Sequence, residues 1–95
     1  MARRCYGINI VVNGRNINEV IIDSHYEKKH RDLTDEVICR LVHTLHGKKL
    51  TFEMVKEGSH FYMMDRIPLN GRHYRLVWCM QDEGNYIGVI NAFRR

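Results

Sequence analysis

Hydrophobic and polar residues alternate along much of the chain, and this pattern is typical of β-strands with one buried face. Near the N-terminus, Ile8, Ile10 and Val12 fall on one side of an extended chain. An Asn13-Gly14 pair follows, and Asn-Gly favours the positive φ angles of a type I′ turn. The pattern therefore predicts a β-hairpin over residues 7–23.

The period changes in residues 34–46, where apolar residues recur at helical spacing. They are Val37, Ile38, Leu41, Val42 and Leu45. Thr34 is suited to the N-cap, and Asp35 and Glu36 place negative charge where the helix dipole favours it. Gly47 supplies a left-handed stop. We predict an amphipathic helix over residues 34–46.

A strand pattern returns from Lys48 onward. Residues 49–58, 59–67, 72–80 and 85–93 predict four strands joined by short turns, which is an antiparallel meander. The alternation is strongest in residues 72–80. The predicted buried face consists of Tyr74, Leu76, Trp78 and Met80, and the opposite face consists of His73, Arg75, Val77 and Cys79.

These elements predict a single α+β domain over residues 1–95. One or two helices pack on a twisted, mostly antiparallel sheet of about four strands, with an N-terminal hairpin. The chain has 95 residues, of which 44% are hydrophobic, and this composition suits a globular domain with one core. No repeat or linker divides it.

Composition excludes several classes of protein. The first apolar run is too short for a secretion signal, and no stretch reaches the roughly 18 apolar residues that span a bilayer. The three cysteines include no C-x-x-C pair, so we expect a reduced, cytoplasmic protein without a disulfide framework. The histidines lack zinc-type spacing and no nucleotide-binding loop occurs, so we expect no metal, no cofactor and no membrane partner.

The basic segment Ser24–Asp32 is the first candidate site. If it is helical, His25, Lys28 and Lys29 share one face, and His30 lies away from them. Lysines suit contact with phosphate, and a histidine that titrates near neutral pH suits proton transfer. The alternative is a solvated lead-in to the helix. The chain carries a net charge of +4, which favours phosphate-bearing or acidic partners.

The second candidate site is His73 with Arg75, on the open face of residues 72–80. An arginine on a rigid strand can clamp a phosphate or a developing oxyanion. The alternative is an ion pair of Arg75 with Asp65 or Glu83.

The C-terminal residues are the third candidate. Asn91, Arg94 and Arg95 are polar or basic at the end of an otherwise apolar strand. The alternative is that the terminal arginines only improve solubility.

The order of these elements resembles the ribonuclease-toxin superfamily of barnase, EndoU, the tRNase colicins and RelE. More narrowly, the chain is similar to a small bacterial domain family with a histidine ahead of a helix start, an arginine on a later strand and a basic last strand. The resemblance covers roughly Ile22 to Arg95. The matching positions are His25, Arg31, Leu33, Thr34, Glu36, Arg75 and 91–94. The N-terminal hairpin departs from the pattern.

The resemblance implies a metal-independent endoribonuclease, the toxin of a toxin–antitoxin or toxin–immunity pair, that cleaves tRNA or mRNA by acid–base transesterification. It implies His25 as base or acid, His30 or His73 as its complement, and Arg75 with Lys28 or Lys29 as stabilisers of charge. Arg31, Asn91 and Arg94 are then expected to bind the substrate, and the partner is a cognate antitoxin or immunity protein.

Two other functions remain open. One is a non-catalytic antitoxin, immunity protein or regulator that holds a partner on the same sheet. The other is a sequence-tolerant nucleic-acid binder, in which exposed aromatic residues such as Tyr62 and Tyr86 stack on bases.

Overall fold

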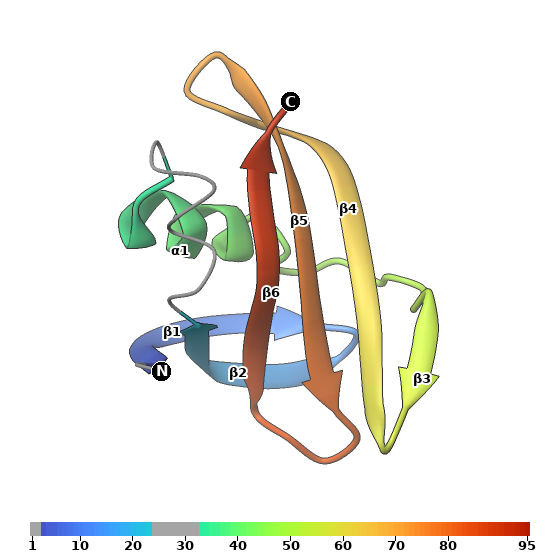
Figure 1. The fold of residues 1–95 in the computed structure, drawn as a ribbon. Helices are drawn as coiled ribbons and strands as arrows, with labels where there is room; N and C mark the ends of the chain where they lie inside the picture. The colour runs from blue at the N-terminus through green and yellow to red at the C-terminus, as the bar shows by residue number, and fades with distance from the viewer. Residues whose placement is uncertain (1–2, 24–32) are drawn as a thin grey trace.

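The computed structural model describes residues 3–23 and 33–95. Within them one six-stranded sheet and one helix form the fold (Figure 1). The elements in chain order are β1 (Arg3–Val12), β2 (Arg15–Asp23), α1 (Asp35–His43), β3 (Met54–Lys56), β4 (Ser59–Leu69), β5 (Arg72–Gln81) and β6 (Tyr86–Arg94). The strand order across the sheet is β1-β2-β6-β5-β4-β3.

The predicted fold class, with one or two helices on about four strands, is wrong. The late strands do form the predicted antiparallel meander, but β2 pairs with β6 in parallel, so the hairpin extends the same sheet to six strands. This pairing joins Glu19 to Tyr86 and Ile22 to Val89, which are far apart in the chain. Figure 1 shows the β1–β2 hairpin lying steeply across β4–β6, so the mixed sheet is strongly twisted.

Tight turns with positive φ angles set the register of three hairpins. The predicted hairpin at Asn13-Gly14 is confirmed, with φ angles of 54° and 73°. Asn70-Gly71 and Glu57-Gly58 have the same signs of φ and join β4 to β5 and β3 to β4. Two-residue turns of this hand match the twist of the strands that they connect.

The strand predicted over residues 49–58 is much shorter in the structure. Only Met54–Lys56 pairs with β4. The backbone N–H of Leu50 donates instead to the side-chain oxygen of Asn13, whose own backbone N–H donates to the Lys48 carbonyl. These hydrogen bonds to Asn13 hold the segment that follows the helix at the β1–β2 turn, so its first residues do not pair with β4.

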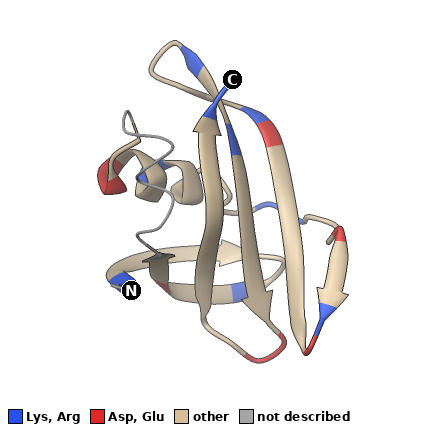
Figure 2. Cartoon of the chain, in the orientation of Figure 1, with Lys and Arg blue, Asp and Glu red and all other residues tan. Residues whose placement is uncertain are grey.

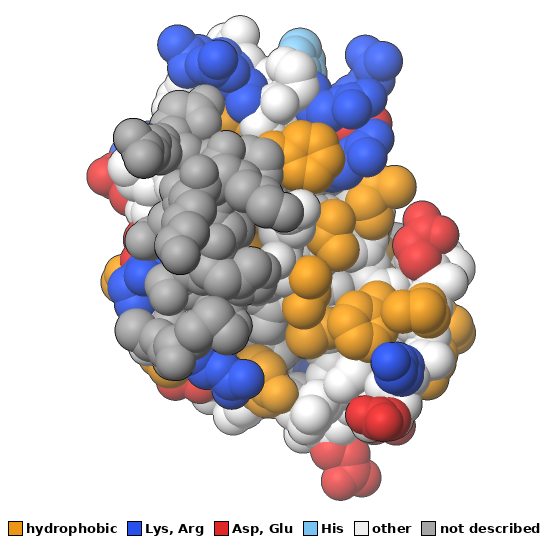
Figure 3. Space-filling model, in the orientation of Figure 1, with side chains coloured by type: hydrophobic (Ala, Val, Ile, Leu, Met, Phe, Trp, Pro, Cys, Tyr) orange, Lys and Arg blue, Asp and Glu red, His pale blue; other side chains and the backbone are white. Residues whose placement is uncertain are grey.

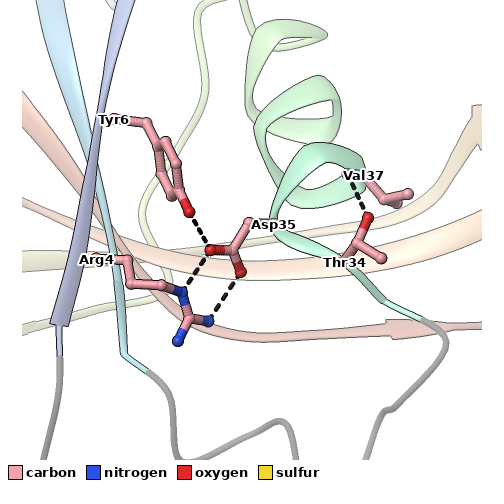
Figure 4. A network of polar contacts seen from close by, with 5 residues as sticks. All are labelled: Arg4, Tyr6, Thr34, Asp35 and Val37. Carbon is pink, nitrogen blue, oxygen red and sulfur yellow. Dashed lines mark hydrogen bonds and ion pairs between the residues drawn. The ribbon is translucent and has the colours of Figure 1, made fainter.

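Helix α1 begins at the predicted N-cap, because the Thr34 hydroxyl accepts a hydrogen bond from the Val37 N–H at 3.3 Å. It ends at His43, earlier than predicted, with Thr44 as its C-cap. Asp35 in its first turn accepts hydrogen bonds from the side chains of Arg4 and Tyr6 on β1 (Figure 4). These contacts join the start of the helix to the edge strand of the sheet.

The core lies between α1 and one face of the sheet. The helix contributes Ile38, Leu41 and Val42. The predicted buried face of β5 is confirmed, because Tyr74, Leu76, Trp78 and Met80 are all buried. Trp78 stacks on Tyr62 of β4, with ring centroids 5.4 Å apart. The opposite face of the sheet, called the outer face below, carries Arg75, which pairs with Asp65.

Candidate functional site at an arginine-rich end of the sheet

Five arginines gather where β4 ends, β5 begins and β6 ends. The register pairs Leu69 with Arg72, Tyr74 with Arg94 and Arg75 with Phe93, so these three strand ends lie side by side. Figure 2 shows Lys and Arg residues at this end, next to the C-terminus. We call it the arginine end, and it comprises Arg66, Arg72, Arg75, Arg94 and Arg95.

Asp65 is the one acidic residue in the three segments that form this end, residues 65–69, 72–75 and 93–95. Its carboxylate accepts from Arg75 Nη2 at 3.0 Å and pairs with Arg95 Nε at 3.1 Å. It also accepts the backbone N–H of Arg66 at 2.9 Å, in a local bond that supports the positive φ of Arg66. One carboxylate therefore orients two guanidinium groups.

From the sequence, an ion pair with Asp65 or Glu83 was the alternative to a phosphate-binding role for Arg75. The ion pair with Asp65 is present. The hydrogen bond from Arg75 is the main reason that the pKa of Asp65 lies below its ordinary value. The Arg75 guanidinium also lies 5.4 Å from the centroid of the Phe93 ring. Arg75 is thus held in place on the outer face, while Arg66 and Arg72 form no ion pair with any described residue.

The lowered pKa predicts how stability depends on pH. A carboxyl whose pKa is lower in the folded state stabilises the fold above its unfolded pKa, about 3.9. That contribution disappears as pH falls through the folded value. We expect Asp65→Asn to unfold at a lower temperature than the wild type near neutral pH, and the difference to shrink in strong acid. Thermal unfolding followed by circular dichroism over this range measures it, and parallel curves would contradict the expectation.

His73 lies at this end, on the predicted open face of β5. Its side chain is exposed, and its backbone carbonyl accepts the N–H of Arg95 at 2.8 Å. This bond ties the arginine after β6 to the start of β5. Among the residues described, His73 is the one histidine in the three segments of the arginine end, so it is the described candidate for proton transfer there.

The other predicted site residues divide into two groups. His25, Lys28, Lys29, His30 and Arg31 lie outside the described residues. Asn91 pairs with Val77 beside a β-bulge, and its side-chain oxygen accepts the N–H of Ala92 at 2.9 Å. The structure thus gives Asn91 a role in the backbone of β6, whereas Arg94 lies at the arginine end.

Sequence reasoning missed Arg66 and Arg72 as members of the site. Arg72 directly follows the turn at Asn70-Gly71, and a hairpin about that turn places it at the start of the strand that carries Arg75. The available signal was therefore the turn motif together with the register that it imposes. Arg66 could not be placed from the register alone, because an irregularity in β4 interrupts the pairing between Met64 and Ile67.

A separate hollow of about 560 Å³ lies between β1 and α1. It is lined by Tyr6, Ile8, Cys39 and His43, among others, and its walls are mostly apolar. Burial raises the pKa of the Cys39 thiol, which disfavours a reactive thiolate there. The side chain of Cys39 packs against the core.

No three His, Cys, Asp or Glu side chains gather into a possible metal site within residues 3–23 and 33–95. In the same part of the chain, no helix has the length and apolar character that crossing a membrane requires. Comparisons with protein-family models, with curated proteins and with solved structures find no match to this chain.

Proposed function

We propose that this protein binds RNA at the arginine end and cleaves it without a metal ion, in the cytoplasm, as the toxin of a pair with a cognate antitoxin or immunity protein. The observation that carries the proposal is the imbalance of charge on a rigid sheet end. Five arginines and one aspartate lie in the three segments of this end, the Asp65 carboxylate pairs with Arg75 and Arg95, and the exposed His73 lies in the same segments. Arginines in this number suit a phosphate backbone, which they contact through paired N–H donors.

The chemistry would be transesterification within RNA. The 2′-OH attacks the adjacent phosphorus, the bond to the 5′-oxygen of the next nucleotide breaks, and a 2′,3′-cyclic phosphate and a 5′-OH form. One group must take the proton of the 2′-OH and another must protonate the leaving oxygen. In this proposal His73 would take one of these roles, and Arg75 would stabilise the charge on the phosphorane. His25 or His30 would supply the other proton transfer.

A binder without catalysis is the second candidate, and the ion pairs of Asp65 favour it. Arg75 and Arg95 both direct N–H groups to that carboxylate. Their remaining donors suit a static contact with phosphate as well as they suit catalysis.

A cleavage and binding assay in EDTA separates the two functions. Single-stranded RNA of mixed sequence, labelled at its 5′ end, would be incubated with the wild type, His73→Ala, His25→Ala and His43→Ala. His43 is an exposed histidine on α1 and serves as the matched control. We expect the wild type and His43→Ala to cleave, and His73→Ala to bind RNA with cleavage reduced on the order of 100-fold.

Three other outcomes of this assay would change the assignment of the catalytic residues or of the function. Loss of cleavage only in His25→Ala would remove His73 from catalysis. Binding by every variant without cyclic-phosphate products would favour the non-catalytic binder. If the folded wild type neither bound nor cleaved RNA, the proposal would be refuted.

A further inference from the structure

The outer face of the sheet carries an apolar surface in the middle of the molecule. We call it the outer patch, and its members are Met54, Phe61, Met63, Val77, Cys79 and Ile90. The register places Met54 beside Phe61, and Met63 beside Val77. Met54 is 51% exposed, and Met63 and Ile90 are each 40% exposed. Figure 3 shows hydrophobic side chains grouped next to one another on the face in view.

Large apolar side chains at this level of exposure on adjacent strands are unusual for a surface that meets only water. α1 cannot cover them, because it packs against the opposite face of the sheet. A partner that buries the outer patch is therefore expected, and the charges at its two ends restrict what that partner is.

The two ends of the β3–β6 meander carry opposite charge. The arginine end lies at one end, and the turns β3–β4 and β5–β6 lie at the other, as Figure 2 shows. Those turns contain Glu57, Asp82 and Glu83, which outnumber the nearby Lys56 and Arg15, the latter of which donates to the Gln81 carbonyl. Asp82 also pairs with His60 at 2.9 Å. We call this the acidic end. The meander is thus basic at one end and acidic at the other, and the outer patch lies between the two ends.

We propose that the outer face binds a second copy of this chain, as a two-fold symmetric dimer. The two-fold axis lies midway between the two sheets, parallel to their planes and perpendicular to the strands. Rotation about it brings the two outer faces together and reverses the strand direction from one copy to the other. The arginine end of each copy then faces the acidic end of its partner, and the two outer patches meet at the centre. A surface that is complementary to itself after this rotation is what an isologous interface requires.

The size of the face is sufficient. Strands β4, β5 and β6, at a spacing of about 4.8 Å and a length of about 30 Å, together with the three residues of β3, give a flat area on the order of 500 Å². Side chains add to this area, and a specific interface buries roughly 800 Å² on each partner. Two sheets that pack face to face lie about 10 Å apart, and their apolar side chains interdigitate in that space.

Sedimentation and light scattering of the purified protein without RNA test the dimer directly. We expect the wild type to have twice the mass of one chain, and Met63→Asp to have the mass of a single chain. Val55→Asp is the matched control, because Val55 is exposed to a similar degree (48%, against 40% for Met63) but pairs with His60 on the other side of β3. It should remain dimeric.

Charge reversal tests the relative orientation of the two copies. Arg95→Glu alone and Glu83→Arg alone should each weaken the dimer, because each places like charges at both contacts. The double variant Arg95→Glu with Glu83→Arg should dimerise again, and an equal mixture of the two single variants should form a heterodimer. Only an arrangement that brings the opposite ends together predicts this recovery.

A single-chain mass at every concentration and salt level would overturn the proposal, as would a dimer that Met63→Asp leaves intact. A dimer that Met63→Asp disrupts, but that charge reversal leaves unchanged, would refute the orientation. The mass measurement contains no RNA, so its result is independent of the proposed ribonuclease. If both proposals hold, RNA and the second copy compete for the arginine end.

Discussion

Replacing Trp78 with alanine should lower the free energy of unfolding by about 3–5 kcal/mol. Trp78 is fully buried at the centre of β5 and stacks on Tyr62. Its removal opens a cavity between the sheet and α1 that the backbone atoms of β5 and its two neighbours, β4 and β6, cannot fill. Domains of this size have a total stability of about 5–15 kcal/mol, so the change is a large part of the whole. Equilibrium unfolding in urea measures it.

Two further variants locate the origin of that loss. Val77→Ala, at the next residue on the outer face, should cost on the order of 1 kcal/mol. Trp78→Phe keeps an aromatic ring against Tyr62 and removes an indole N–H that has no hydrogen-bond partner among the described residues. Its cost should be well below that of Trp78→Ala. Equal losses in Trp78→Ala and Val77→Ala would show that the core does not lie where the structure places it.

The affinity for single-stranded RNA should fall about 50-fold between about 50 and about 200 mM salt, if the arginine end neutralises about four phosphates. The physical reason is that each neutralised phosphate releases condensed counterions, and release is less favourable in high salt. Fluorescence anisotropy with a labelled oligonucleotide measures the slope.

Removing two arginines should halve that slope. The double variant Arg66→Ala with Arg72→Ala is suitable because neither side chain forms an ion pair with a described residue. Its affinity should fall only about 7-fold over the same salt range. Lys48→Ala with Lys49→Ala removes the same charge away from the arginine end and should keep the wild-type slope. Equal slopes in the two double variants would place the RNA elsewhere.

Local features of the fold were predictable because neighbouring residues determine them. The turn at Asn13-Gly14, the Thr34 cap and the buried face of β5 all depend on residues within a few positions of one another. The sheet was mispredicted because alternation shows which side of a strand is buried and does not show which strand lies beside it. The parallel pairing of β2 with β6 joins residues 19–22 to residues 86–89, which no local pattern relates.

The candidate site was predictable in part for the same reason. His73 and Arg75 share a face because they are two residues apart in one strand, and Asp65 was a foreseen partner of Arg75. The gathering of Arg66, Arg72 and Arg95 around that pair depends on a turn, a bulge and the end of a third strand. None of these relations appears as a pattern in the sequence.

By itself, the sequence determined a globular domain with an excess of basic residues, an amphipathic helix and a series of strands with known inner faces. Those properties follow from short-range periodicity and composition. The tertiary structure alone decided that the hairpin joins the meander in one mixed sheet and that charge separates to its two ends. The physical reason is that strand pairing is a contact between segments far apart in the chain, which periodicity along each segment does not specify.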